Sequence, residues 1–361
     1  MSDQKKKKFN VLLFILKFFA FLTAAICVIV PVSIGTLMYL NAPYRQVRIS
    51  ETEGITVQDD GSYFVWVRRG ETSQSVGSRL KQAGLIKSRL FWNLLCRREE
   101  GLIKAGTFRV EMPKTQLSIL KELIQGEPII KRITIPEGVT LRRAARILEN
   151  AGICKIEDFI EAAGNPGIVD HYNIPNRTME GYLFPDTYLF PVNYQPEEIV
   201  REMADNFFKR IAAVNPGALD MSPQELNEKV IIASIIEREY ILPSEAPLMA
   251  GVFFNRLRVR MALQSCATVE YIITEIQGKP HPTRLFYRDL EIENPYNTYI
   301  RPGLPPGPVS SPGTVALRAA MFPQATDFFY FRLVDPSSGI HYFSRTLDDH
   351  NRAEWLYLKG L

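Results

Sequence analysis

"VRRGETSQSVGSRLKQAGLI", residues 67–86, recurs later in the chain as "IPEGVTLRRAARILENAGI", residues 135–153. Each copy has a glycine, then a threonine that can cap a helix, then an amphipathic stretch closed by glycine. The pattern predicts a strand, a turn and a helix, twice over. Chance agreement among common helix-cap residues is the alternative. Seven positions match at one constant spacing: Gly70, Thr72, Val76, Leu80, Ala83, Gly84 and Leu85 with Gly138, Thr140, Ala144, Leu148, Ala151, Gly152 and Ile153.

The segments that follow extend the repeat. "GTFRV" at Gly106 and "DTYLF" at Asp186 have the composition of strands, and each precedes a helical pattern. We therefore expect two β-α-β-type modules, at residues 62–130 and 131–210, after a polar connector at 43–61. The second module contains an insertion at 165–185 that is rich in proline, glycine and aromatic residues. Loops on a repeated scaffold often carry function, so we expect a substrate contact there.

Residues 211–361 are typical of a mainly helical region. Ser222, Pro223 and Glu225 predict a helix start with a capping box, which assigns the apolar run 230–236 to a buried helix of about 17 residues. Two further helices are expected through residues 248–257 and 269–276. Strand-like residues on both sides of "DPSSG", at 335–339, predict a C-terminal hairpin, and Thr346 with Asp349 begins a last helix. The predicted fold class is α+β.

A proline-rich segment, "ENPYNTYIRPGLPPGPVSSPG", occupies residues 293–313. Proline fixes the backbone and removes hydrogen-bond donors, so this segment is expected to be a stiff, irregular loop. A simple linker is one interpretation. Polar and aromatic residues at its head, and folded sequence after it, favour the rigid wall of a cleft.

The N-terminus has the pattern of a membrane anchor. Lys5 to Lys8 precede a stretch from Phe18 to Leu40 without charged side chains, which is long enough to cross a hydrocarbon core of about 30 Å. The basic residues predict a cytoplasmic segment at 1–17, a single transmembrane helix at 18–40, and everything beyond on the outer, periplasmic side of the inner membrane. A cleaved signal peptide is the alternative, but its apolar region is usually only about 7–15 residues long.

Charge and composition exclude several classes of function. The net charge of +4 comes entirely from the first 17 residues, which argues against a nucleic-acid partner for the folded region. Nucleophile-elbow, phosphate-loop, zinc-protease and dinucleotide motifs are missing, and the histidines lack the spacing of zinc ligands, so no metal or cofactor is expected. Cys96 and Cys154 are either a disulfide pair or free thiols, and buried free thiols are the favoured interpretation.

Glu237 stands where the apolar run 230–236 ends. A carboxyl group beside apolar surface has its pKa raised and can serve as a general acid near neutral pH, as glycoside cleavage requires. Glu239 is the obvious second acid, but two positions on a helix are about 200° apart, so the two side chains should face opposite sides. On local sequence alone, an ordinary exposed helix-end acid is the more common outcome.

The chain closely resembles the YceG-like (MltG) family of endolytic murein transglycosylases. The motifs that carry this resemblance are "ASIIEREY", "FFNRLRVRMALQSCATVEY", "YNTY", "GLPPGP", "HYFSRTLDDHN" and "EGYLFPDTY", in that family's order and at compatible spacing, together with the single N-terminal anchor. The resemblance covers most of the chain from about residue 63.

This resemblance implies a membrane-anchored enzyme with LysM-like modules that cuts within the glycan strands of peptidoglycan, beside the cell-wall synthases. It makes Glu237 the catalytic acid and base. Glu237 would protonate the oxygen that links N-acetylmuramic acid to N-acetylglucosamine, and the 6-hydroxyl of the muramic acid would close a 1,6-anhydro ring. Because that nucleophile is part of the substrate, one carboxyl group is sufficient.

One motif departs from the family pattern. Where the family usually has Gln-Thr-Asp-Pro-Thr, residues 264–268 are Gln-Ser-Cys-Ala-Thr, so any role for an acid at Cys266 is in doubt. Gln264 and Thr268 remain candidate sugar contacts. Weaker candidates, each of which could equally be a cap, a turn former or a core aromatic, are Asn255, Asn297, Tyr299, Glu180 and Tyr188. A non-catalytic peptidoglycan-binding scaffold and a hydrolytic muramidase are the alternative functions.

Overall fold

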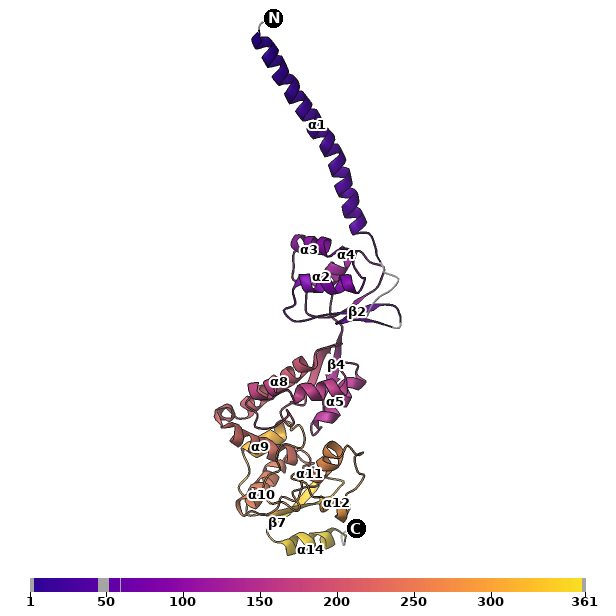
Figure 1. The fold of residues 1–361 in the computed structure, drawn as a ribbon. Helices are drawn as coiled ribbons and strands as arrows, with labels where there is room; N and C mark the ends of the chain where they lie inside the picture. The colour runs from indigo at the N-terminus through magenta and orange to yellow at the C-terminus, as the bar shows by residue number, and fades with distance from the viewer. Residues whose placement is uncertain (1–2, 45–51, 59, 359–361) are drawn as a thin grey trace. The chain divides into compact units, whose positions relative to one another are not determined.

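The computed structural model describes residues 3–44, 52–58 and 60–358, with side chains for 16–44, 52–58 and 60–353. The chain folds as two compact units, residues 1–129 and 130–361 (Figure 1). Residues 45–51 and 59 of the expected connector lie outside the described residues. Both helices and strands are present, which confirms the α+β class.

Helix α1, Asp3–Leu40, opens the first unit. Its residues Leu16–Leu40 have a mean hydropathy of 2.4 and are long and apolar enough to cross a membrane. The segment expected to span the membrane, 18–40, lies within this range. The helix also takes in the lysine run, because lysine is a good helix former.

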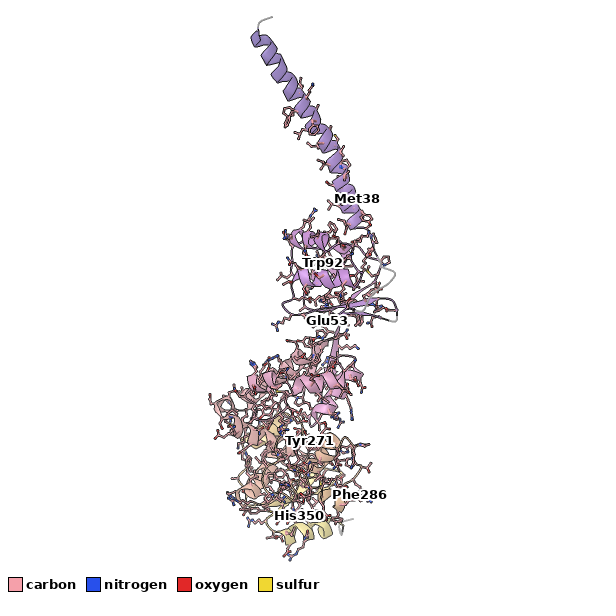
Figure 2. The ribbon with its side chains drawn as sticks, viewed as in Figure 1. Met38, Glu53, Trp92, Tyr271, Phe286 and His350 are labelled. Atoms are coloured by element: carbon pink, nitrogen blue, oxygen red, sulfur yellow. The ribbon has the colours of Figure 1, made fainter. Side chains whose placement is uncertain are left out.

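The rest of the first unit is a three-stranded antiparallel sheet, in the order β1-β2-β3, packed against helices. Trp92, labelled in Figure 2, is fully buried in its core and donates from Nε1 to Ser73 O at 2.9 Å. Strand β1 lies in the expected connector and was not predicted, because only one of its three residues, Ile55, is buried. The elements are β1 Ile55–Val57, β2 Tyr63–Val67, α2 Ser73–Gln82, α3 Arg89–Arg98, β3 Gly106–Val110 and α4 Gln116–Gln125.

The second unit begins with the second copy of the repeat. Strand β4 pairs antiparallel with β5, as β2 does with β3, and helices lie between the paired strands in sequence. The returning strands predicted at Gly106 and Asp186 are confirmed as β3 and β5. The elements are β4 Ile130–Thr134, α5 Leu141–Asn150, α6 Ile156–Ala163, α7 Pro166–His171, β5 Thr187–Pro191 and α8 Pro196–Val214.

The two repeat helices, α2 and α5, start and stop in the same way. Thr72 caps α2 and Thr140 caps α5, each accepting from the backbone N–H three residues on, at 3.2 and 3.3 Å. Both helices end with a glycine of positive φ, at residues 84 and 152. The next N–H then bonds back five residues, from Leu85 to Leu80 and from Ile153 to Leu148, at 2.9 Å. The repeat predicted from sequence is therefore confirmed in local structure.

Among the remaining elements, α9 packs against α10 and α13, and α14 packs against the β6 and β7 strands. The capping box of Ser222 and Glu225, the C-terminal hairpin of β6 and β7, and the Thr346–Asp349 cap are confirmed. Helix α9 is shorter than predicted, 14 residues, and α13 was not predicted. The bounds are a 3-10 turn Pro216–Asp220, α9 Pro223–Ile236, α10 Ala246–Arg258, α11 Cys266–Tyr271, a π-helical turn Ile272–Ile276, α12 Tyr287–Leu290, α13 Thr314–Met321, β6 Tyr330–Asp335, β7 Ile340–Ser344 and α14 Leu347–Leu358.

Candidate active site

Glu237 is the first residue beyond α9 and is only partly buried, whereas residues 230–236 are all buried. Its backbone N–H still bonds to Ala233 O at 2.9 Å, which holds it at the helix end. One carboxyl oxygen, Oε2, accepts from the backbone N–H of Gly313 at 2.8 Å, and Oε1 accepts from Tyr240 Oη at 3.4 Å. The carboxyl group is therefore held at both oxygens while part of it stays open to solvent.

Burial is the main reason that the pKa of Glu237 rises, from 4.5 to about 7. The Gly313 N–H acts in the opposite direction, and the negative charge of Glu137 raises the pKa further. The expectation of a partly buried Glu237 with a raised pKa is confirmed. Near neutral pH this group can both donate and accept a proton, which acid-base catalysis requires.

Glu137 is a second acid beside Glu237 that sequence reasoning missed. It precedes Gly138 in the turn before α5, and its side chain is exposed. A methyl group added at Gly313 would collide with the Glu137 carboxylate, and the same Gly313 donates its N–H to Glu237. One backbone position thus contacts both acids. The two glutamates are a hundred residues apart in sequence, so no local pattern could have paired them.

The end of the proline-rich loop is fixed against α9 by Ser234, which is fully buried. The Ser234 hydroxyl accepts from Val309 N at 3.0 Å, and its carbonyl accepts from Ser310 Oγ at 2.9 Å. Ser311 exchanges backbone hydrogen bonds with the Gly138 turn, at 2.9 and 2.8 Å. Residues 309–313 therefore form a fixed wall beside Glu237, as predicted for this loop, and the linker interpretation is wrong.

The three residues 237–239 face three different segments. Arg238 donates to Gly138 O at 3.2 Å and pairs with Glu270 at 2.6 Å, whereas Glu239 accepts from Ser265 Oγ. The prediction that Glu239 faces away from Glu237 is confirmed. Its stated reason was wrong, because α9 ends at Ile236 and the following residues form a turn rather than a helix.

Four of the predicted sugar contacts lie in one cluster. Glu239, in the turn after α9, contacts this cluster by accepting a hydrogen bond from Ser265 Oγ. Gln264, exposed and in the left-handed region at φ 51°, donates its N–H to Thr298 O at 3.0 Å. Thr268 is buried and lies 2.9 Å from the Thr298 hydroxyl. Asn297 is fully buried and accepts from Tyr299 N at 2.9 Å. Tyr299 Oη lies 3.1 Å from Cys266 Sγ, the position at which the sequence resemblance implied an acid.

The other predicted contacts are buried and occupied by internal partners. Both carboxyl oxygens of Glu180 accept from Leu141 N at 3.1 Å, at the start of α5, and burial raises its pKa to about 8. Tyr188 Oη donates to Phe184 O at 2.6 Å, inside the second module. Asn255 donates to two carbonyl oxygens ahead of β6, both at 2.9 Å. These contacts account for the three residues structurally, and their roles in substrate binding stay predictions.

The sequence predictions also concerned the cysteines and the possible metal ligands. The four cysteines are free thiols, with Cys96 and Cys154 partly buried, and burial raises the pKa of both. Within the described ranges, side chains do not gather into a group of three or more metal ligands.

Comparison with known proteins gives one consistent result. The YceG-like family profile matches residues 65–354. A Streptococcus pneumoniae protein named endolytic murein transglycosylase is 29% identical over 315 residues, which cover 80% of this chain and 57% of that protein. A Bacillus subtilis protein of the same name is 30% identical over 311 residues, which cover 81% of this chain and 83% of that protein. This chain thus spans little more than half the length of the Streptococcus relatives.

A crystal structure of a yceG-like protein from Listeria monocytogenes is similar over most of its length. The alignment covers 81% of this chain and 98% of that one, with a TM-score of 0.54 and 28% sequence identity.

Proposed function

The chain belongs to the YceG-like family, and we propose that it is a membrane-anchored lytic transglycosylase that cuts within peptidoglycan glycan strands. The observation that carries this proposal is the Glu237 carboxyl group, whose pKa is raised to about 7 and which is held by the Gly313 N–H at 2.8 Å. The names of the curated relatives support the reaction class.

Glu237 would act first as an acid and then as a base. Protonated, it gives its proton to the glycosidic oxygen between N-acetylmuramic acid and N-acetylglucosamine, and the bond from that oxygen to C1 breaks. The resulting carboxylate takes the proton from the 6-hydroxyl of the muramic acid, whose oxygen bonds to C1 and closes the 1,6-anhydro ring. No water is consumed. The Gly313 N–H, at the start of α13, stabilises the carboxylate between the two steps.

A hydrolytic muramidase is the second candidate, and Glu137 is the observation that favours it. Hydrolysis commonly uses a second carboxylate that activates water, and Glu137 reaches the same backbone position as Glu237. The two reactions differ only in whether water or the 6-hydroxyl group attacks C1.

Digestion of purified glycan strands by the full-length protein in detergent separates these functions. Mass analysis should show 1,6-anhydro ends, lighter by one water molecule than the products of hydrolysis. Water-added ends would instead establish the muramidase. Binding to the strands without cleavage would leave the non-catalytic scaffold.

The anchor and the repeat modules complete the proposal. Helix α1 would span the inner membrane once, with residues 1–17 in the cytoplasm and the rest on the periplasmic side, which its apolar segment Leu16–Leu40 supports. The modules at 62–130 and 131–210 would be LysM-like and bind glycan, supported by their antiparallel strands and shared helix caps. Cutting newly made strands would place the enzyme beside cell-wall synthases. Protection of residue 361 from protease in intact spheroplasts would contradict this topology.

A further inference from the structure

A cavity of about 470 Å³ lies between α5 and α11, beside the turn that carries Glu237. This volume is within the range of small-molecule sites, about 300–1,000 Å³. Tyr271, labelled in Figure 2, lies in its wall together with Arg238 and Val309. Arg238 follows Glu237 directly, and Val309 belongs to the wall that Ser234 fixes. The cavity therefore adjoins the turn that carries Glu237, although Glu237 itself does not line it.

The lining of the cavity has more positive charge than its own acids can balance. Arg143 and Arg146 lie one turn apart on the exposed face of α5, and Lys279 approaches from beyond the π-helical turn. Among the residues that the structure describes, none of these three side chains forms an ion pair. The fourth cation, Arg238, pairs with Glu270, and Glu275 accepts from Thr140 Oγ1 at 2.9 Å. Arg143, Arg146 and Lys279 are therefore available to bind an anionic ligand.

The two glutamates of the lining are already engaged, because Glu270 pairs with Arg238 and Glu275 pairs with Arg142 at 3.6 Å. The positive charge that remains is divided between α5 and the segment beyond the π-helical turn, as single charges on separate side chains. A peptide distributes single carboxylates and amino groups along its length and can match this mixture of charges. Arginine binds carboxylates with paired hydrogen bonds, and the face of α5 adds an amide group at Asn150.

The substrate proposed above carries such a peptide. In peptidoglycan, a short peptide with several free carboxylates is attached to the lactyl group of N-acetylmuramic acid, the same sugar whose C1 bond would be cut. Arg238 donates to Gly138 O, and Gly138 lies against the Glu237 side chain, where an added Cβ would be 3.6 Å from Glu237 Cγ. The backbone of Gly138 therefore lies between Arg238, in the cavity wall, and the Glu237 side chain.

We propose that this cavity binds the carboxylate-bearing peptide of the muramic acid at the cleavage position, so that peptide-bearing strands are cut in preference to bare ones. The inference depends on the proposed function, because it assigns a subsite to the same substrate. Each charge-assisted hydrogen bond to the peptide should contribute roughly tenfold to the preference.

The test compares peptide-bearing strands with strands stripped of peptide by an amidase, using the full-length protein in detergent. For wild type, kcat/KM should be at least about tenfold higher on peptide-bearing strands. In the double variant Arg143→Gln, Arg146→Gln this ratio should fall toward one, mainly through KM. The matched control is Arg352→Gln, an exposed arginine on α14 outside the cavity and outside both modules, which should keep the wild-type ratio. Equal rates of wild type on both substrates would overturn the inference.

A binding measurement keeps the inference separate from the proposed function. The Glu237→Gln variant, titrated calorimetrically with a soluble disaccharide-peptide fragment, should bind with a Kd at least about tenfold lower than when it also carries both arginine substitutions. If the wild-type protein cleaves neither type of strand while this difference in Kd remains, the proposed function alone is refuted. If the wild-type protein cleaves both types of strand and the arginine substitutions do not change the Kd of the fragment, the inference alone is refuted. Displacement of the fragment by inorganic phosphate at lower concentrations than by acetate would identify a phosphate site and also overturn it.

Discussion

Replacing Glu237 with glutamine should make the second unit more stable at alkaline pH while removing the proposed catalytic acid. Folding raises the pKa of this carboxyl group from 4.5 to about 7, so the fold favours its protonated form. In the wild-type protein, this preference stabilises the folded state fully below about pH 4.5, and the stabilisation is lost as the pH rises through 7. Glutamine cannot ionise, so it avoids this loss. At about 1.4 kcal/mol per pH unit, and with partial exposure reducing the effect, the variant should gain about 2–3 kcal/mol above pH 7.

Hydrogen exchange of the α9 amides in urea is a suitable measurement, because it reports the free energy of unfolding of the second unit alone. Wild type and variant should differ little at pH 4.5 and by the full amount at pH 8.5. Glu228→Gln is the matched control, an exposed acid on the same helix, and should change stability by less than about 0.5 kcal/mol at both pH values. An equal difference between Glu237→Gln and wild type at both pH values would refute the reasoning, since it could not come from ionisation.

Three further predictions concern the rate, the wall beside Glu237 and the anchor. The value of kcat/KM should be flat below pH 7 and fall by about tenfold per unit above it as Glu237 loses its proton; a fall beginning near pH 4.5 would contradict the raised pKa. Ser234→Ala should leave Val309 N–H unsatisfied, lower the free energy of unfolding by about 1–3 kcal/mol in the same exchange measurement, and reduce kcat more than it changes KM; full activity would show that this contact does not position the wall. The full-length protein should stay in the membrane pellet after an alkaline wash, whereas a chain starting at residue 43 should be released; equal retention would contradict anchoring by α1.

The parts of the fold that sequence predicted well are set by local chemistry. Thr140 caps α5 because its hydroxyl group can reach an N–H three residues away, and Gly152 ends the helix because glycine accepts a positive φ. The Ser222 capping box and the β6–β7 hairpin follow the same logic. Each of these signals involves residues within a few positions of one another, so it is visible in the sequence.

The parts that sequence missed depend on long-range packing. Gly313 donates to Glu237 from 76 positions away, and Glu137 reaches the same place from a turn in the second module. Sequence reasoning identified Glu237 through its apolar neighbours and its motif but could not supply either partner. Strand β1 was missed for another reason: three residues with a single buried side chain carry too weak a pattern.

The predicted sugar contacts divide in a way that spacing could not reveal. Gln264 and Tyr299 are brought together because residues 264–268 bond to Thr298. Glu180 instead lies at the start of α5, where both carboxyl oxygens accept from Leu141 N. A buried acid with a raised pKa can thus serve either catalysis or a helix start. The two acids differ in their access to solvent, because Glu237 is partly exposed and Glu180 is deeply buried.

The most direct test of the central claim is the yield of 1,6-anhydro ends from purified glycan strands, measured by mass spectrometry for wild type, Glu137→Gln and Glu237→Gln side by side. Wild type and Glu137→Gln should both produce anhydro ends, because the 6-hydroxyl group needs no second carboxylate. Glu237→Gln should fold and bind strands but release fewer than about one in a thousand of the wild-type products. Anhydro ends from Glu237→Gln at a rate near that of wild type would contradict the account.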